Sequence, residues 1–376
     1  MSRVRNRCRP DDRRRAIALA IGRWFAENAR TLPWREHRTG YTALVSEAML
    51  QQTQVSRVVK SYIAFMERFP TVQHLANATE QEVLAMWQGL GYYRRARNLH
   101  AAAMKICSDP QFSGAVPQSV DQLRELPGVG RYTAGAIASI VFQHREPIVD
   151  GNVQRVFARL EGHADVHSRE GAALCWEWAK QLVDQANNPG ELNEGLMELG
   201  AVVCTPRAPR CAACPTSQWC QAFKAGKQES LPAPKPQAKQ VDVHHHAVII
   251  RRGGRILLEQ RPIEAVLRTS KTTIKEKTMK NGAMWGSMWQ TPTIESDVPL
   301  TPRAVRARLA IDVDSLVRQG AFVHQTTHRR ITFHVFTART RARRGTWRKP
   351  GDVRDLPMSN PQRRIVKMAM EEVSVG

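Results

Sequence analysis

Four closely spaced cysteines near position 210 are the sequence feature that most restricts which folds this chain can adopt. Cys204, Cys211, Cys214 and Cys220 follow the spacing C-x6-C-x2-C-x5-C. Four thiolates in so short a segment can close around one compact inorganic centre, and the prolines between them stiffen the loops. The ligands alone fit either tetrahedral zinc or a [4Fe–4S] cluster. Such clustering disfavours the remaining alternative, which is a set of buried free thiols.

The charge of the chain indicates a polyanionic partner. Its 56 lysines and arginines exceed its 34 aspartates and glutamates, which gives a net charge of +22 and a pI near 10.4. This surplus favours salt-sensitive contacts with the phosphates of nucleic acid. The alternative is a basic surface that serves only solubility.

The N-terminal residues do not resemble a secretion signal. Residues 1–15 are rich in arginine and lack an apolar core, and no later segment reaches the roughly 18 apolar residues of a membrane span. We therefore expect no membrane association and a reducing compartment, such as a bacterial cytoplasm with its nucleoid. There, clustered cysteines serve as metal ligands rather than as disulfides.

The periodicity of apolar residues changes once along the chain. From about Ala16 to Ala222 they return every three or four positions, which predicts helices, with breaks at several prolines. Residues 231–240 are rich in proline and lysine and predict an extended linker. Beyond it, AVIIRRGGRILLEQ and ITFHVFTAR predict strands and a hairpin. We expect a helical domain over residues 1–230, a linker over 231–240 and an α+β domain over 241–376.

The segment LPGVGRYTAGAIASIVF places Gly128 and Gly130 in a tight turn before an apolar helix. Backbone N–H groups at such a helix start can bind a DNA phosphate, favoured by the positive end of the helix dipole. A plain connection between two packed helices is the alternative.

Two carboxylates stand out in the helical part. Glu47 lies among small, apolar and amide side chains in YTALVSEAMLQQTQV, where a buried glutamate needs a hydrogen bond or a proton, so its pKa is expected to be raised. Asp150 precedes an amphipathic run at the position of an N-cap. An exposed glutamate and a plain cap are the alternatives.

Together, several segments resemble those of a known family. SEAMLQQTQV, GLGYYRRARNLH, LPGVGRYTAGAI, PIVDGNVQRV, NEGLMELG and the cysteine cluster are similar to the helix-hairpin-helix DNA glycosylases, and within them to the MutY-type adenine DNA glycosylases. The similarity runs in order from about Arg30 to Cys220. It implies a multidomain protein, in which an all-α helix-hairpin-helix glycosylase domain binds a [4Fe–4S] cluster through the four cysteines.

The resemblance also implies a reaction. The substrate would be double-stranded DNA in which adenine is mispaired with 8-oxoguanine or guanine, and we expect a monomer. Glu47 would protonate the departing adenine, while an ionised Asp150 would stabilise the oxocarbenium-like sugar. Tyr132 stands where strand-cleaving relatives carry a lysine nucleophile, which implies a monofunctional glycosylase with Tyr132 near Asp150. Asn152 would orient Asp150 or the catalytic water.

Further roles follow from the same resemblance, residue by residue. Trp34, Arg35 and Glu194 would line the pocket for the flipped adenine, and Gln52 and Tyr92 would wedge into the duplex beside the orphaned base. The residues expected to hold phosphates are Gly128, Gly130, Arg94, Arg95 and Arg97.

The C-terminal part resembles a Nudix-like domain that reads the lesion. Thr326, Thr327 and His328 occupy the place of the family's Phe-Ser-His. Thr327 and His328 can hydrogen-bond a purine edge, whereas Thr326 offers no aromatic wedge. The glutamate-rich Nudix metal box is absent from the sequence, and a basic, threonine-rich segment at 269–280 departs from the family pattern.

Three other functions are alternatives. A glycosylase with lyase activity on oxidised pyrimidines would need a lysine in place of Tyr132. A non-catalytic, redox-responsive DNA clamp would need neither Glu47 nor Asp150, and both carboxylates repel phosphate. A nucleotide pyrophosphatase fused to a DNA-binding domain would need the missing metal box.

Overall fold

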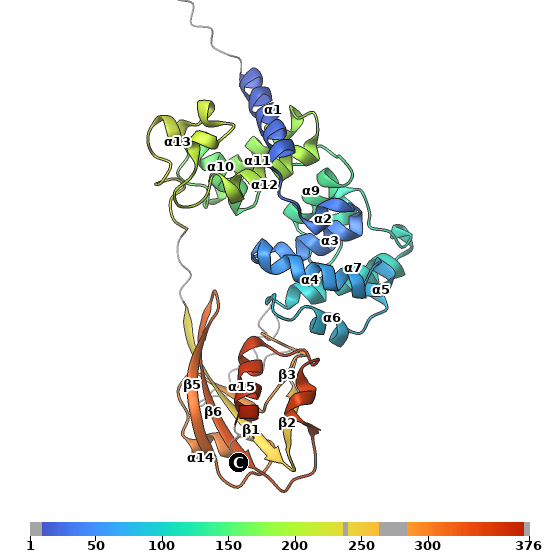
Figure 1. Cartoon of the computed structure of the whole chain (residues 1–376), viewed down its shortest axis with the longest axis vertical. Coiled ribbons are helices and arrows are strands. Elements are labelled where there is room, and N and C mark those ends of the chain that lie inside the picture. The colour runs from blue at the N-terminus through green and yellow to red at the C-terminus, as the bar shows by residue number, and fades with distance from the viewer. Residues whose placement is uncertain (1–9, 236–239, 263–283, 372–376) are drawn as a thin grey trace, which may run out of the picture. The chain divides into compact units, whose positions relative to one another are not determined.

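The computed structural model describes residues 10–235, 240–262 and 284–371. The chain forms two compact units, one made of Met1–Asn77 and Asn98–Pro236 and the other of Ala78–Arg97 and Gln237–Gly376 (Figure 1). The sequence analysis did not anticipate that residues 78–97 belong to the second unit. The basic segment at 269–280 lies outside the described residues.

The first unit is helical, as the periodicity predicted, and no strand occurs among its described residues. Prolines mark the helix boundaries as expected, since the second helix begins at Pro33 and the fourth ends just before Pro70. The helices are α1 (Pro10–Asn28), α2 (Pro33–Glu36), α3 (Gly40–Leu50), α4 (Val55–Arg68), α5 (Val72–Ala76), α7 (Arg94–Ser108, which begins in the second unit), α8 (Val120–Arg124), α9 (Arg131–Ile140), α10 (Gly151–Leu160), α11 (Arg169–Asp184), α12 (Pro189–Val202) and α13 (Gln221–Lys224).

One apolar core joins α1 to α10, α11 and α12. Ile21 of α1, Phe157 of α10 and Leu196 of α12 are all at most 1% exposed within it. The helices that carry Asp150 and Glu194 are therefore fixed against each other by burial. None of the helices that the structure describes is long and apolar enough to cross a membrane.

The second unit is built on a mixed sheet. Parallel pairing of β1 with β6 forms its centre, while β2, β4 and β5 pair antiparallel with these two. The predicted hairpin is present, because β1 and β2 are joined at Gly253 and Gly254, both with positive φ. The strands are β1 (Val241–Arg252), β2 (Arg255–Gln260), β3 (Trp289–Gln290), β4 (Thr293–Ser296), β5 (Val317–Gln325), β6 (Arg329–Arg339) and β7 (Thr346–Arg348).

Both faces of this sheet are covered. Alternate residues of β1 and β6 pack on one side with Ile365 of α15 (Asn360–Glu371) and on the other with Val305 of α14 (Pro302–Arg306). The unit is thus α+β, as the sequence predicted.

Residues 78–97 attach to the second unit through side chains. Gln81, which lies in α6 (Glu80–Met86), donates to the carbonyl of Ser287 at 2.9 Å. Gln88 donates to the carbonyl of Leu356 at 2.9 Å. These bonds hold the loop that carries Tyr92.

Candidate active site

A cavity of about 730 Å³ in the first unit brings together most of the residues singled out in the sequence. It is large enough for a nucleobase with its sugar. Its lining includes ten of them: Trp34, Arg35, Glu47, Gln52, Gly128, Gly130, Tyr132, Asp150, Asn152 and Glu194.

Glu47 lies on α3 and is 8% exposed. Burial raises the pKa of Glu47 to about 7, with smaller increases from the charges of Asp150 and Glu194, while a hydrogen-bonding contact with Tyr132 opposes the shift. The carboxyl can therefore hold a proton near neutral pH, as the sequence analysis expected.

Asp150 caps α10 and faces the same cavity. One carboxylate oxygen accepts from the backbone N–H of Val153 at 2.7 Å, and the other accepts from the Asn152 amide at 3.0 Å. Burial raises the pKa of Asp150, and the hydrogen bonds from Val153 and Asn152 and the charge of Arg155 oppose that shift. Asp150 is thus both an N-cap and a carboxyl with strong hydrogen-bond donors around it.

Arg155 holds the side chain of Asn152 in place. Its guanidinium donates to the Asn152 side-chain oxygen at 2.8 Å and to the carbonyl of Cys204 at 2.7 Å. Gly200 of α12 allows this close approach, since an added Cβ there would lie 2.6 Å from the Cβ of Asn152. The sequence analysis did not identify Arg155.

Tyr132 is partly buried and interacts with both carboxylates. Its hydroxyl donates to Met197 Sδ at 3.0 Å, and burial raises its pKa well above the ordinary value, with the charges of Glu47 and Asp150 adding to the effect. The side chain therefore stays a neutral phenol with a proton to donate.

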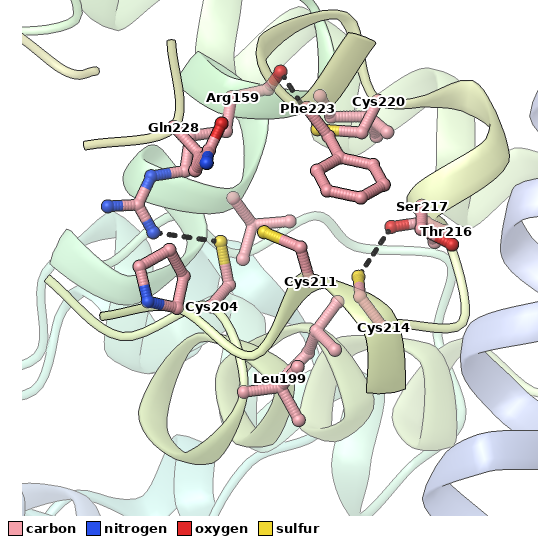
Figure 2. A pocket seen from close by; sticks show the side chains of 14 residues that line it. Arg159, Leu199, Cys204, Cys211, Cys214, Thr216, Ser217, Cys220, Phe223 and Gln228 are labelled. Atoms are coloured by element: carbon pink, nitrogen blue, oxygen red, sulfur yellow. Dashed lines mark hydrogen bonds between the residues drawn. The ribbon is translucent and has the colours of Figure 1, made fainter. Parts of the chain in front are cut away.

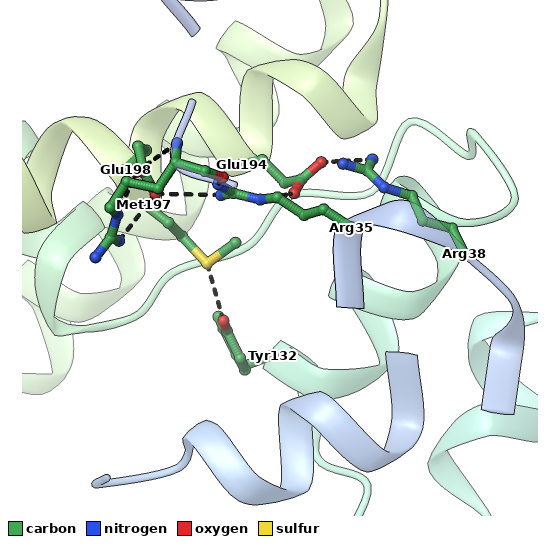
Figure 3. Close-up of polar contacts among 7 residues, drawn as sticks. Arg35, Arg38, Tyr132, Glu194, Met197 and Glu198 are labelled. Carbon is green, nitrogen blue, oxygen red and sulfur yellow. Dashed lines mark hydrogen bonds and ion pairs between the residues drawn. The ribbon is translucent and has the colours of Figure 1, made fainter. Parts of the chain in front are cut away.

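Five charged side chains on one wall of the cavity are joined by ion pairs (Figure 3). They are Arg30, Arg35, Arg38, Glu194 and Glu198. Arg35 Nε donates to Glu194 at 2.9 Å, and Arg35 NH2 donates to Glu198 at 3.1 Å. Arg30 donates to both oxygens of Glu198, and Arg38 pairs with Glu194 at 2.6 Å. Sequence reasoning missed Arg30, Arg38 and Glu198, although the i,i+4 spacing of the two glutamates on α12 was a usable signal.

The hairpin before α9 is built as the two glycines predicted. Gly128 has a φ of +81°, and an added Cβ would lie 2.6 Å from Asn98 Cβ. Gly130 is the N-cap of α9 and has open space where a Cβ would point. The start of α9 is therefore accessible to a ligand of the size of a phosphate.

Two more lining residues have distinctive geometry. Trp34 packs edge-on against Tyr62, with ring centroids 5.5 Å apart. Gln52 is exposed and has a φ of +55°, which is strained for a residue with a side chain. Such strain is typical of functional loops.

The four cysteines line a pocket of their own (Figure 2). Arg159 donates to Cys204 Sγ at 3.3 Å, and Cys214 Sγ lies 3.3 Å from the Thr216 hydroxyl. Burial raises the pKa of Cys204 and Cys220, so a metal centre must displace their protons on binding.

The four cysteine thiolates fit a cofactor that binds each of them at a different metal atom. All four cysteines are among the residues that line the pocket. A [4Fe–4S] cluster takes one thiolate per iron, so its ligands need not converge on a single point. The arginine beside Cys204 also suits an anionic group.

Tyr92, Thr327 and His328 lie in the second unit. The hydroxyls of Tyr92 and Thr327 are 3.1 Å apart, and Tyr92 is 51% exposed with a φ of +48°. His328 is exposed at the turn between β5 and β6. Thr326 helps to close that turn, because its hydroxyl accepts the N–H of Arg329 at 3.1 Å.

The expectation that Arg95 holds a phosphate is wrong. Arg95 is 8% exposed, its guanidinium donates to the carbonyls of Leu90 and Gly91, and it lies over the rings of Trp87 and Tyr92. It stabilises the loop from inside instead. Arg97 is engaged by Glu80 at 3.3 Å, and Arg94 is exposed.

Comparison with known proteins identifies the family of this chain. Residues 45–181 match the HhH-GPD superfamily of base excision DNA repair proteins, and residues 265–368 match the NUDIX domain. The adenine DNA glycosylase of Schizosaccharomyces pombe is 32% identical over 338 residues, which cover 79% of this chain and 72% of the yeast protein. This chain belongs to the adenine DNA glycosylase family.

Other known proteins match a smaller part of this chain. The human adenine DNA glycosylase is 44% identical over 234 residues, which are 60% of this chain but 42% of the human protein. The chain thus spans under half the length of that mammalian relative. A thermostable thymine-DNA glycosylase has a similar fold, with a TM-score of 0.52 and 28% identity over 57% of this chain and 98% of that one.

Proposed function

We propose that this member of the family is a monofunctional adenine DNA glycosylase that removes adenine opposite 8-oxoguanine or guanine. The observation that carries the proposal is the placement of Glu47 and Asp150 on one base-sized cavity. The names of its curated relatives agree with it.

Glu47 would act as the general acid. With a pKa raised to about 7, its carboxyl can transfer a proton to N7 of adenine, so the bond from N9 to C1′ breaks with a neutral leaving base. Such a proton transfer typically contributes about 10²–10⁴ in rate.

Asp150 would stabilise the positive charge that develops on the sugar. A water adds to C1′ and gives its proton to the carboxylate of Glu47, which leaves an abasic site, free adenine and a reprotonated Glu47. Asn152 and Arg155 hold the Asp150 carboxylate in place. Tyr132 cannot form the imine on which strand cleavage by a lyase depends, so the phosphodiester backbone stays intact.

The four cysteines would hold a [4Fe–4S] cluster. The cluster would give structural support to the α10–α13 region, and Arg207 and Arg210, between the first two cysteines, would supply positive charge for contact with DNA. Iron and acid-labile sulfide analysis of protein purified without oxygen tests this, with about four of each per chain expected. One zinc per chain would contradict it.

DNA would be bound largely through charge. The net charge of +22 and the open start of α9 at Gly130 support phosphate contacts. We further propose that Tyr92, Thr327 and His328 contact the base opposite adenine, that Gln52 wedges into the duplex, and that the protein acts as a monomer in a reducing compartment.

A single-turnover assay tests the function. Duplexes with adenine opposite 8-oxoguanine, and with thymine glycol opposite adenine, are treated with wild type and Glu47→Gln and analysed with and without alkali. We expect adenine release with strand scission only after alkali, lost in Glu47→Gln while binding persists. Alkali-independent scission at thymine glycol would indicate a lyase, and binding without release of either base would indicate a non-catalytic protein.

A further inference from the structure

Glu198 has no role in the reaction as proposed so far, yet it is among the most buried charges beside the cavity. Its side chain is 2% exposed. Arg30 binds it with two guanidinium nitrogens and with its backbone N–H, and Arg35 NH2 donates to it at 3.1 Å. Burial alone would raise the pKa of Glu198, but the hydrogen bond from Arg30 and the charges of Arg35 and Arg30 hold it below its ordinary value.

Glu198 acts on the cavity through Arg35. The guanidinium of Arg35 is held at all three nitrogens, by Glu194, by Glu198 and by the carbonyl of Arg30 at 2.9 Å. Its orientation toward Glu194 therefore depends on Glu198. Phe25 adds an apolar support, since the guanidinium carbon of Arg35 lies 5.0 Å from the centre of its ring.

We propose that Glu198 is a positioning residue for base excision, which fixes Glu194 through Arg35 as an anionic acceptor on the cavity wall. This inference rests on the proposed function. Glu194 is 4% exposed, and Arg35 and Arg38 bind its two oxygens. An acceptor-only carboxylate there is complementary to an exocyclic amino group and repels a carbonyl.

The same arrangement influences Glu47. The charged or titratable groups that face Glu47 are Tyr132 from α9, Asp150 at the start of α10 and Glu194 from α12. Replacing Glu198 by a neutral amide leaves Arg30 and Arg35 with less compensating negative charge. Their positive charge then favours ionisation of Glu47, so the pH above which Glu47 loses its proton falls.

The test is the pH profile of single-turnover adenine release by Glu198→Gln. We expect a 10- to 100-fold slower release at pH 7.5, an alkaline limb that moves to lower pH, and a Kd for uncleaved duplex within about threefold of wild type. Glu198→Asp, which keeps the charge, should restore part of the rate and the position of the limb. If Glu198→Gln fails to fold, Arg30→Gln, at a partly exposed position, should move the limb to higher pH, because it removes a positive charge instead of a negative one.

A matched control is available in the same unit. Arg13 binds both oxygens of Glu161, at 2.9 and 3.0 Å, away from the residues that line the cavity. Glu161→Gln should lower stability without moving the pH profile. A slower rate in Glu198→Gln that is equal at every pH, or a profile changed equally by Glu161→Gln, would show that Glu198 is only structural. No adenine release by wild type would instead refute the proposed function.

Discussion

The burial of Glu47 makes ionisation of its carboxyl unfavourable and at the same time suits this carboxyl to donate a proton. A carboxyl that is 8% exposed is costly to ionise, and that cost is what allows it to keep a proton near neutral pH. The same property must therefore appear in both the activity and the stability of the protein.

Replacing Glu47 by Gln should stabilise the fold more at pH 8 than at pH 5. The folded-state pKa of about 7 lies above the ordinary 4.5, so proton binding favours the native state at low pH, and this contribution is lost as the pH rises through 7. The amide carries no such penalty. The difference between the two pH values should be on the order of 3 kcal/mol and is measured by urea unfolding. A difference that does not change with pH would contradict the burial argument.

Asp150 has two roles that substitution can separate. Asp150→Asn keeps an N-cap oxygen but removes the charge, so the free energy of unfolding should change by under about 1 kcal/mol while adenine release falls by at least about 100-fold. Asp150→Ala should lose both activity and about 1 kcal/mol more stability. Ser168→Ala removes the cap of α11, where the Ser168 hydroxyl accepts from Gly171 at 3.0 Å, and should lower stability alone. If Asp150→Asn stays active, the charge is not required.

At the scale of elements, the turn before α9 offers a direct comparison of two glycines. Gly128 needs its positive φ and has no room for a Cβ, whereas Gly130 has ordinary dihedral angles and open space. Gly128→Ala should therefore cost about 1–3 kcal/mol of stability. Gly130→Ala should leave the melting temperature nearly unchanged but weaken binding of duplex DNA several-fold, because the methyl group blocks the approach of a phosphate. Equal losses of affinity and stability in both variants would argue against a phosphate site.

The elements themselves were largely predictable from sequence. A period of three to four residues predicted the helical unit, and alternation around Gly253 and Gly254 predicted the hairpin, because both periods follow from which face is buried. Glu47, Gly128 and Gly130 could be singled out from their own neighbours, but the roles of most other cavity residues followed only from resemblance to a family, since nothing local distinguishes Asp150 from any other N-cap.

Other features depend on contacts between distant parts of the chain. Glu198 and Arg30 are 168 positions apart, so no local pattern reveals their ion pair. The arginine run at 94–97 was expected on the surface, yet Arg95 is buried under Tyr92, because only the folded loop supplies the carbonyls that satisfy its guanidinium.

At the scale of the whole molecule, the proposed chemistry is divided between the two units. The cavity with Glu47 belongs to the first unit, and Tyr92 and Thr327 belong to the second, although Tyr92 lies far from the C-terminal residues in the sequence. A unit assembled from two segments can join a loop residue of one to a turn residue of the other. The 3.1 Å contact between the two hydroxyls is such a junction.

This contact should make the two residues act as one in reading the opposite base. A hydroxyl that shares a hydrogen bond with its neighbour has one fewer free donor or acceptor, so Tyr92 sets what Thr327 can offer to a purine edge. The N7 of 8-oxoguanine donates a hydrogen bond, whereas that of guanine accepts one. Tyr92→Phe and Thr327→Val should each reduce the preference for adenine opposite 8-oxoguanine over guanine by about 5- to 10-fold, which is about 1 kcal/mol.

The double variant decides whether the pair is coupled. If the hydroxyls act together, Tyr92→Phe with Thr327→Val should reduce the preference no further than either change alone, a double-mutant cycle with a coupling of about 1 kcal/mol. Tyr93→Phe is the control, since the Tyr93 hydroxyl donates to the carbonyl of Met358 at 3.4 Å and does not touch Thr327. Additive losses would show that Tyr92 and Thr327 read the base independently, and the hydrogen bond between them would then only hold the turn of β5 and β6 against the loop at Tyr92.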